Sequence, residues 1–216
     1  MFLDLLEPAD RDAVEQAGTV RRFSRGDVLF RQGDDPGAVL IVRDGRIKVS
    51  VVTPDGHDVM LGFGGPGMVL GDLAAIDGEP RSTTATAVDP VEVLGVPMLA
   101  FRALLEQRLG MLMALARVSA ERLRAADRQR VEFAAYDVLG RVALRIDALA
   151  EDGTETAEGI EIDAGLSQED LAAWTSASRE AVSKALGAMR TLGWIETRRR
   201  VIVVRDRAAL RRHAGL

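Results

Sequence analysis

The sequence predicts an α+β chain with a β-rich N-terminal half, a long central helix and a mainly helical C-terminal third. Between residues 20 and 98, short apolar runs alternate with pairs such as Asp44-Gly45 and Asp55-Gly56, a pattern typical of strands joined by tight turns. Over residues 98–135, apolar side chains recur in steps of three and four, as on one face of a helix. After residue 166, two short segments with helix-start signals precede a hairpin pattern.

The N-terminal half begins with an expected helix over residues 4–18 and continues with short strands. We expect strands within residues 28–30, 39–42, 47–52, 59–63 and 91–94. Many short strands at near-regular spacing favour a barrel, roll or sandwich.

The helix expected over residues 98–135 carries a narrow apolar stripe between Arg-rich faces. This pattern favours a parallel two-stranded contact between two copies of the chain, and therefore a homodimer. The alternative is that the stripe packs on the core of its own domain. Residues 136–140 are expected to form a hinge, residues 141–150 a further helix, and the acidic residues 151–159 an exposed loop.

Composition excludes several classes of function. The 216 residues include no cysteine and only two histidines, which argues against disulfides, iron–sulfur clusters and a His-rich zinc site. No long apolar run indicates a membrane span, and no secretory signal is evident. We therefore expect a cytoplasmic protein that needs no cofactor or metal and has no membrane partner.

Charge is distributed unevenly along the chain. Residues 1–105 contain 10 Lys and Arg against 16 Asp and Glu, whereas residues 179–212 contain 10 against 3. The basic C-terminal part is therefore the part expected to meet a phosphate backbone.

A group of polar residues in the β-rich half could hold a sugar and a phosphate together. Gly71-Asp72-Leu73 forms a short acidic turn, and Arg81-Ser82-Thr83 follows. Arginine offers a planar fork of donors to phosphate oxygens, and the two hydroxyls add further donors. Asp72 is placed to accept hydrogen bonds from ribose hydroxyls.

The C-terminal third contains the pattern of a helix-turn-helix. Ser167 begins a short helix at Gln168 with a capping-box pattern, and Ser178 begins a second helix over residues 179–191. Ser176 lies in the turn between them. Residues 194–197 and 201–204 then form an expected hairpin wing whose tip is Arg198-Arg199-Arg200, suited to contacting phosphates.

Both patterns resemble the CRP/FNR transcription regulators. The first resembles their phosphate-binding cassette, and Ser178-Arg179-Glu180-Ala181-Val182-Ser183-Lys184 resembles their recognition-helix motif. The resemblance implies a double-stranded β-helix (jelly-roll) sensor domain over residues 1–100, a dimerisation helix and hinge over 101–137, and a winged helix-turn-helix over 138–216. The DNA-binding residues that follow from it are Ser167, Gln168, Ser178, Arg179, Glu180, Ser183, Lys184, Arg198, Arg199 and Arg200.

The resemblance also implies how the recognition helix reads DNA. Arg179 would pair with a guanine edge, Glu180 would accept from cytosine N4, and Lys184 would reach a second guanine. The family more often has arginine at this last position, so recognition of that base should be broader here.

The residues expected to bind the effector are Gly71, Asp72, Leu73, Arg81, Ser82, Thr83, Ala126 and Asp127. Three of them depart from the family pattern. Asp72 stands where Glu is usual, while Ala126 and Asp127 stand where cyclic-AMP-binding members have two polar residues that bind adenine. A carboxylate suits the two donors of a guanine edge, which makes cyclic GMP an alternative effector to cyclic AMP.

The expected function is that of a dimeric regulator that binds double-stranded operator DNA and is controlled by a small effector, cyclic AMP being the first candidate. RNA polymerase is a candidate partner. The alternative is an effector-independent DNA-binding regulator with a degenerate nucleotide pocket. An enzyme acting on nucleotides is a third hypothesis, and the sequence offers no catalytic constellation for it.

Overall fold

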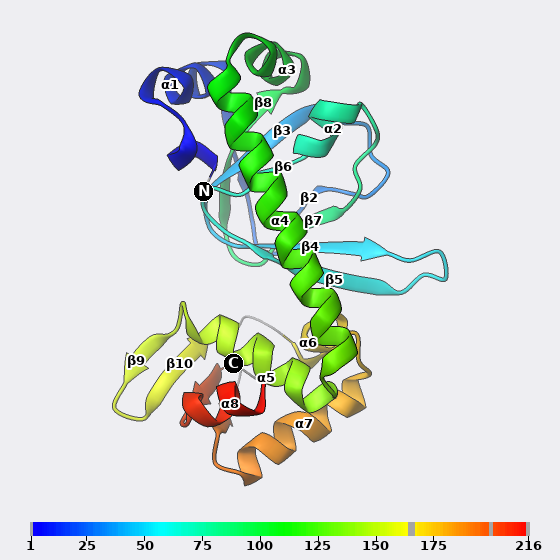
Figure 1. Cartoon of the computed structure of the whole chain (residues 1–216), viewed down its shortest axis with the longest axis vertical. Coiled ribbons are helices and arrows are strands. Elements are labelled where there is room, and N and C mark those ends of the chain that lie inside the picture. Colours follow the sequence, from blue (N-terminus) through cyan, green and yellow to red (C-terminus); the bar gives the residue numbers. More distant parts are fainter. Residues whose placement is uncertain (1, 164–166, 199–200, 215–216) are drawn as a thin grey trace. The chain divides into compact units, whose positions relative to one another are not determined.

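A computed structural model describes residues 2–163, 167–198 and 201–214. The chain forms two compact units, Met1–Ala126 and Asp127–Leu216, which we call the N-terminal and C-terminal units (Figure 1). Among the described residues, no helix combines the length and apolarity that crossing a bilayer requires.

The N-terminal unit contains two four-stranded antiparallel sheets, with strand orders β1-β8-β3-β6 and β2-β7-β4-β5. Their strands are β1 (Thr19–Phe23), β2 (Val28–Phe30), β3 (Ala38–Asp44), β4 (Ile47–Val52), β5 (Asp58–Gly64), β6 (Val69–Leu70), β7 (Thr84–Ala87) and β8 (Val91–Pro97). The helices of this unit are η1 (Phe2–Leu5), α1 (Pro8–Ala17), α2 (Asp72–Asp77) and α3 (Met98–Gln107), together with the start of α4 (Leu109–Ala135).

Strand β3 is buried on both of its faces, which explains its continuous apolar run. Leu40 and Val42 point into a core shared with β2, β4 and β7 of the other sheet, so the two sheets form a sandwich. Val39 and Ile41 alternate to the opposite face and join a second core with the helices α1, α3 and α4. The predicted double-stranded β architecture of the N-terminal half is confirmed.

The prediction of a single helix over residues 98–135 is wrong in one respect, because the structure has two helices there, α3 and α4. Arg108 separates α3 from α4 with extended backbone angles, φ −130° and ψ 94°. Its guanidinium Nη1 donates to Asp10 Oδ1 at 2.7 Å and to the Ala9 carbonyl oxygen at 3.3 Å, both in α1. These contacts fix the break at a position where the sequence contains no helix-breaking residue.

The C-terminal unit packs α5, α6, α7 and α8 with one antiparallel sheet of order β11-β12-β10-β9. The bounds are α5 (Val138–Ala150), β9 (Thr154–Thr156), β10 (Gly159–Asp163), α6 (Gln168–Thr175), α7 (Arg179–Thr191), β11 (Ile195–Arg198), β12 (Val201–Val204) and α8 (Arg207–His213). Its core contains the apolar faces of α5 and α7 and the inner face of the sheet.

The loop predicted over residues 151–159 is wrong in part. Residues 154–156 form β9, and Gly159 begins β10, so this acidic stretch contains one edge of the sheet and a turn. Pairing of β10 with β12 joins it to the hairpin that follows α7. The sequence pattern missed it because the strand β9 has three residues, all exposed, and no apolar alternation.

Candidate functional site

The predicted phosphate cassette is assembled around Arg81, whose side chain is 6% exposed. Its Nη2 donates to the Ala38 carbonyl oxygen, and its guanidinium carbon lies 4.3 Å from the centre of the Phe30 ring. Nε and Nη1 are buried and have no hydrogen-bond partner among the described residues. Burial lowers the pKa of Arg81, and the carboxylates of Asp34 and Asp72 oppose that shift.

Unpaired buried donors are costly, so these two nitrogens fit an anion that accepts from both of them. The chain supplies the space for this arrangement at Gly71, which precedes α2 with φ +78°. A Cβ at this position would overlap the Arg81 guanidinium. Glycine is therefore required both by the backbone conformation and by the approach of Arg81.

Asp72 is 2% exposed and is paired with Arg122 of α4. Arg122 Nη1 lies 2.9 Å from Oδ1 and 2.8 Å from Oδ2, and Nη2 donates to the Val69 carbonyl oxygen. The carboxylate that was expected to face a ribose is therefore already engaged by a cation from the long helix.

The other predicted effector residues are more exposed. Leu73 and Ser82 lie at the surface and Thr83 is half-buried. Ala126 and Asp127 are exposed on α4, where Asp127 pairs with Arg130 at 2.9 Å. The structure thus brings Gly71, Asp72 and Arg81 together, whereas Asp127 is held by a neighbour on its own helix.

The predicted helix-turn-helix is confirmed, and so are the two N-cap residues, Ser167 and Ser178. Ser167 and Asp170 form a complete capping box at the start of α6, with the Asp170 amide 3.1 Å from Ser167 Oγ and the Ser167 amide 3.0 Å from Asp170 Oδ2. Ser178 Oγ accepts from the Ala181 amide at 3.2 Å at the start of α7. Between the helices, Ser176 adopts the left-handed conformation, with φ +47°.

Helix α7 has one buried and one exposed face. Val182, Leu186 and Met189 are buried in the core of the unit. Seven predicted DNA-binding residues are exposed at the starts of α6 and α7: Ser167, Gln168, Ser178, Arg179, Glu180, Ser183 and Lys184. Within the described part of the chain, Arg179 and Lys184 form no ion pair, so their charges face solvent.

The predicted hairpin wing is β11 and β12, with Arg198 at the end of β11. Arg199 and Arg200 lie outside the described residues. Arg198 is not free, because Glu196 and Glu158 both accept from its guanidinium.

Arg122 and Glu158 were not among the residues predicted from the sequence, although each contacts one that was. Each lies in a stretch that contains several residues of the same charge. Arg122 contacts Asp72, 50 residues earlier, and Glu158 contacts Arg198, 40 residues later. A search for charge partners along α4 and across strand neighbours could have found them only once the fold was known.

Comparison with known proteins agrees with both halves of the structure. Residues 20–108 match the cyclic nucleotide-binding domain family, and residues 140–213 match the Crp-like helix-turn-helix domain family. A CRP-like cAMP-activated global transcriptional regulator of Mycobacterium tuberculosis is 32% identical over 193 residues, covering 89% of this chain and 86% of that protein.

Solved structures give the same result. A CRP-family transcriptional regulator of Thermus thermophilus has a TM-score of 0.79 and 27% identity, covering 91% of this chain and 97% of that one. The c-di-GMP responsive global regulator CLP of Xanthomonas campestris has a TM-score of 0.82 at 20% identity, covering 92% and 99%, and shows the fold alone.

The fold and these matches define a regulator that joins a domain of the cyclic nucleotide-binding type to a helix-turn-helix. The chain belongs to the CRP/FNR family of transcription regulators. Proteins of this family regulate transcription and are not enzymes; they bind DNA and are usually dimeric.

Proposed function

We propose that the chain is a homodimeric, sequence-specific DNA-binding regulator whose activity is controlled by a nucleotide bound in the N-terminal unit. In this proposal residues 1–100 sense the effector, residues 101–137 supply the dimer contact and hinge, and residues 138–216 bind the operator. Such a regulator acts in the cytoplasm, where RNA polymerase is a candidate partner.

The observation that carries the effector proposal is the pair of buried, unpartnered donors on Arg81. A phosphate diester has acceptor oxygens that satisfy both donors and a charge that compensates the buried guanidinium. Ser82 and Thr83 follow directly and would add hydroxyl donors. Asp72 and Arg122 would contact the ribose side of the ligand, while Leu73 would border it.

Cyclic AMP is the first candidate because the Mycobacterium tuberculosis relative is described as cAMP-activated. Cyclic GMP is the alternative that the carboxylate of Asp127 suggests. That carboxylate already pairs with Arg130, so a guanine edge would have to compete with an ion pair. This observation favours cyclic AMP.

The test is calorimetric titration of the purified protein with each cyclic nucleotide. We expect cyclic AMP to bind in the micromolar range and Arg81→Met to abolish the heat. Arg22→Met is the control, since it removes an exposed arginine of the same unit that pairs with Glu92. Binding that survives Arg81→Met would contradict the proposed site.

The second candidate function is an effector-independent regulator. The observation that favours it is the engagement of both Asp72 oxygens by Arg122, which leaves fewer acceptors for a ribose. Operator binding that is equally tight with and without either cyclic nucleotide would support this candidate.

On the DNA side, we propose that the exposed residues of α7 read base edges in the major groove. Arg179 would contact a guanine, Glu180 a cytosine N4, and Lys184 a second guanine. Ser167, Gln168, Ser178 and Ser183 would contact the backbone near the helix starts, and the wing arginines Arg198, Arg199 and Arg200 would contact phosphates. Selection from a random duplex library should return a palindrome, since a symmetric dimer places two recognition helices in successive major grooves.

A further inference from the structure

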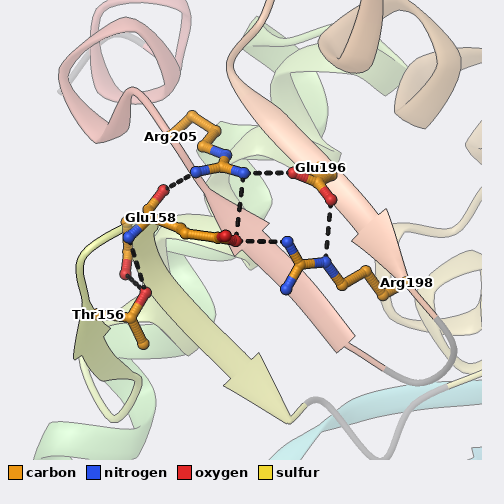
Figure 2. A network of polar contacts seen from close by, with 6 residues as sticks. Thr156, Glu158, Glu196, Arg198 and Arg205 are labelled. Carbon is orange, nitrogen blue, oxygen red and sulfur yellow. Dashed lines mark hydrogen bonds and ion pairs between the residues drawn. The ribbon is translucent and has the colours of Figure 1, made fainter.

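A closed network of charges covers the outer face of the wing sheet (Figure 2). Arg198 Nε donates to Glu196 Oε1 at 2.9 Å, and Arg198 Nη2 donates to Glu158. Arg205 Nη2 donates to Glu196 and lies 3.4 Å from Glu158 Oε2. Two guanidinium groups and two carboxylates thus alternate around one ring of contacts, and their charges cancel. We call Glu158 and Glu196 the wing clamp.

The turn between β9 and β10 places Glu158 in this ring. Thr156 Oγ1 donates to the Gly159 carbonyl oxygen at 2.7 Å and accepts from the Glu158 amide at 3.2 Å. Gly159 has φ +129°, and a Cβ there would lie 2.2 Å from the Val204 carbonyl oxygen. The close approach of β10 to the end of β12 allows Arg205 Nη1 to donate to the Glu158 carbonyl oxygen as well.

Apolar side chains lie on the same face of the sheet as the charged network. Val203 pairs with Glu196 on one side and Glu161 on the other, and Val201 pairs with Arg198, so these residues share the outer face of the sheet. Val203 is 1% exposed although it does not belong to the core of the C-terminal unit. The aliphatic parts of the charged side chains are the groups on this face that can cover it.

The cations on the proposed DNA-binding surface differ in whether a carboxylate pairs with them. Arg179 and Lys184 on α7 face solvent without an ion-pair partner among the described residues, whereas Arg198 is held by two carboxylates. The hydrogen bonds that Arg205 and Arg198 donate lower the pKa of Glu196, and those that Arg198 donates to Glu158 and Glu196 raise the pKa of Arg198. These hydrogen bonds favour the ionised forms of Glu196 and Arg198.

We propose that Glu158 and Glu196 compete with DNA for Arg198. Arg198 then binds a backbone phosphate only after it has released both carboxylates. The clamp lowers the affinity for any DNA sequence and leaves base recognition by α7 unchanged. This inference rests on the proposed function, because it assigns a regulating contact to the same DNA-binding unit.

The experiment compares the full-length wild type with Glu158→Gln and Glu196→Gln. Binding to a fluorescein-labelled duplex of mixed sequence is measured by anisotropy between about 50 and 200 mM NaCl, where phosphate contacts dominate the salt dependence. Each variant should bind about two- to fivefold more tightly at the lower salt concentrations. The slope of log K against log salt should steepen by about 0.9 for each wing that gains a phosphate.

Glu161→Gln is the matched control. It removes the same charge from the same row of the same sheet face, and Glu161 has no contact with Arg198 among the described residues. The gain should also vanish when Glu158→Gln is combined with Arg198→Gln, as a double-mutant cycle requires. Unchanged thermal melting of the variants verifies that the sheet remains folded.

The outcomes separate the clamp from the proposed function. A gain in Glu161→Gln as large as in the clamp variants, or a gain that persists without Arg198, would overturn the clamp while leaving DNA binding intact. Weaker binding by the clamp variants would also overturn it, because the carboxylates would then position Arg198 for phosphate. No DNA binding by the wild type or any variant would overturn the proposed function together with the clamp.

Discussion

Arg122 of α4 and Asp72 of α2 form an ion pair in which one guanidinium nitrogen lies within 2.9 Å of both carboxylate oxygens. This pair connects the long helix directly to the cassette around Arg81. Asp72 is almost fully buried, whereas the side chain of Arg122 is 37% exposed. The two charges therefore contribute unequally to the free energy of folding.

Arg122→Met should lower the free energy of unfolding by about 2 kcal/mol, because it leaves a buried carboxylate without its cation. Urea denaturation measures the effect. The double variant Arg122→Met/Asp72→Asn should recover about half of the loss, since no uncompensated charge remains. Strictly additive effects of the two substitutions would show that the pair is not coupled.

Arg81→Met should abolish nucleotide binding and at the same time raise stability in nucleotide-free buffer by about 1 kcal/mol. The reason is that two buried donors without partners are replaced by an apolar side chain against Phe30. Thermal and urea denaturation provide the measurement. A stability loss of more than about 1 kcal/mol would indicate that the Ala38 hydrogen bond outweighs the unpaired donors.

Two neighbouring serines should respond in opposite directions. Ser176→Gly should stabilise the protein by about 0.5–1 kcal/mol, because glycine adopts positive φ without the steric cost that serine carries. Ser178→Ala should destabilise it by about 1 kcal/mol through loss of the N-cap of α7. Denaturant titration of both variants tests the pair, and a destabilising Ser176→Gly would show that the serine side chain contributes more than its backbone strain costs.

The dimer contact that we propose for α4 should depend on its exposed apolar residues, including Leu109, Leu112 and Leu123. Leu123 is 60% exposed, and Leu123→Glu should raise the dimer dissociation constant at least about tenfold by placing charge in the contact. Analytical ultracentrifugation measures this. Leu99→Glu on α3, where the leucine is 81% exposed, is the control and should leave the dimer intact.

The wing clamp should make stability depend on acid pH. The pKa of Glu196 in the folded protein is lowered by its hydrogen bonds to Arg205 and Arg198, so its contribution is present above the ordinary glutamate pKa of about 4.3 and is lost as pH falls through the lowered value. Glu196→Gln should therefore lose less thermal stability than the wild type over that acid range. Identical pH profiles of the two proteins would contradict the clamp as a stabilising contact.

The sequence predicted features whose signals lie within a few residues of one another. The cap serines of α6 and α7 and the short apolar runs followed by Asp-Gly pairs are local patterns, and the structure confirms the helices and strands that they predict. The left-handed turn at Ser176 was also predictable, because a tight turn between two helices requires a positive φ at one position.

What the sequence could not predict depends on pairs distant along the chain. Arg122 meets Asp72 across 50 residues, and Arg198 meets Glu158 across 40. Any of several charged neighbours could have formed these pairs, and only the packing of α4 and of the sheet edge selects among them. The same holds for the break at Arg108, which depends on Asp10, 98 residues earlier.

The break at Arg108 makes the start of α4 depend on contacts with α1. Arg108 is bound to α1, and a Cβ at Gly110, the second residue of α4, would come within 2.8 Å of Asp10. Helix α1 ends before residue 20, where the match to the cyclic nucleotide-binding domain family begins. A chain that began at residue 20 would keep strands β2 to β8 but would lose α1, and with it the contacts that hold Arg108 between α3 and α4.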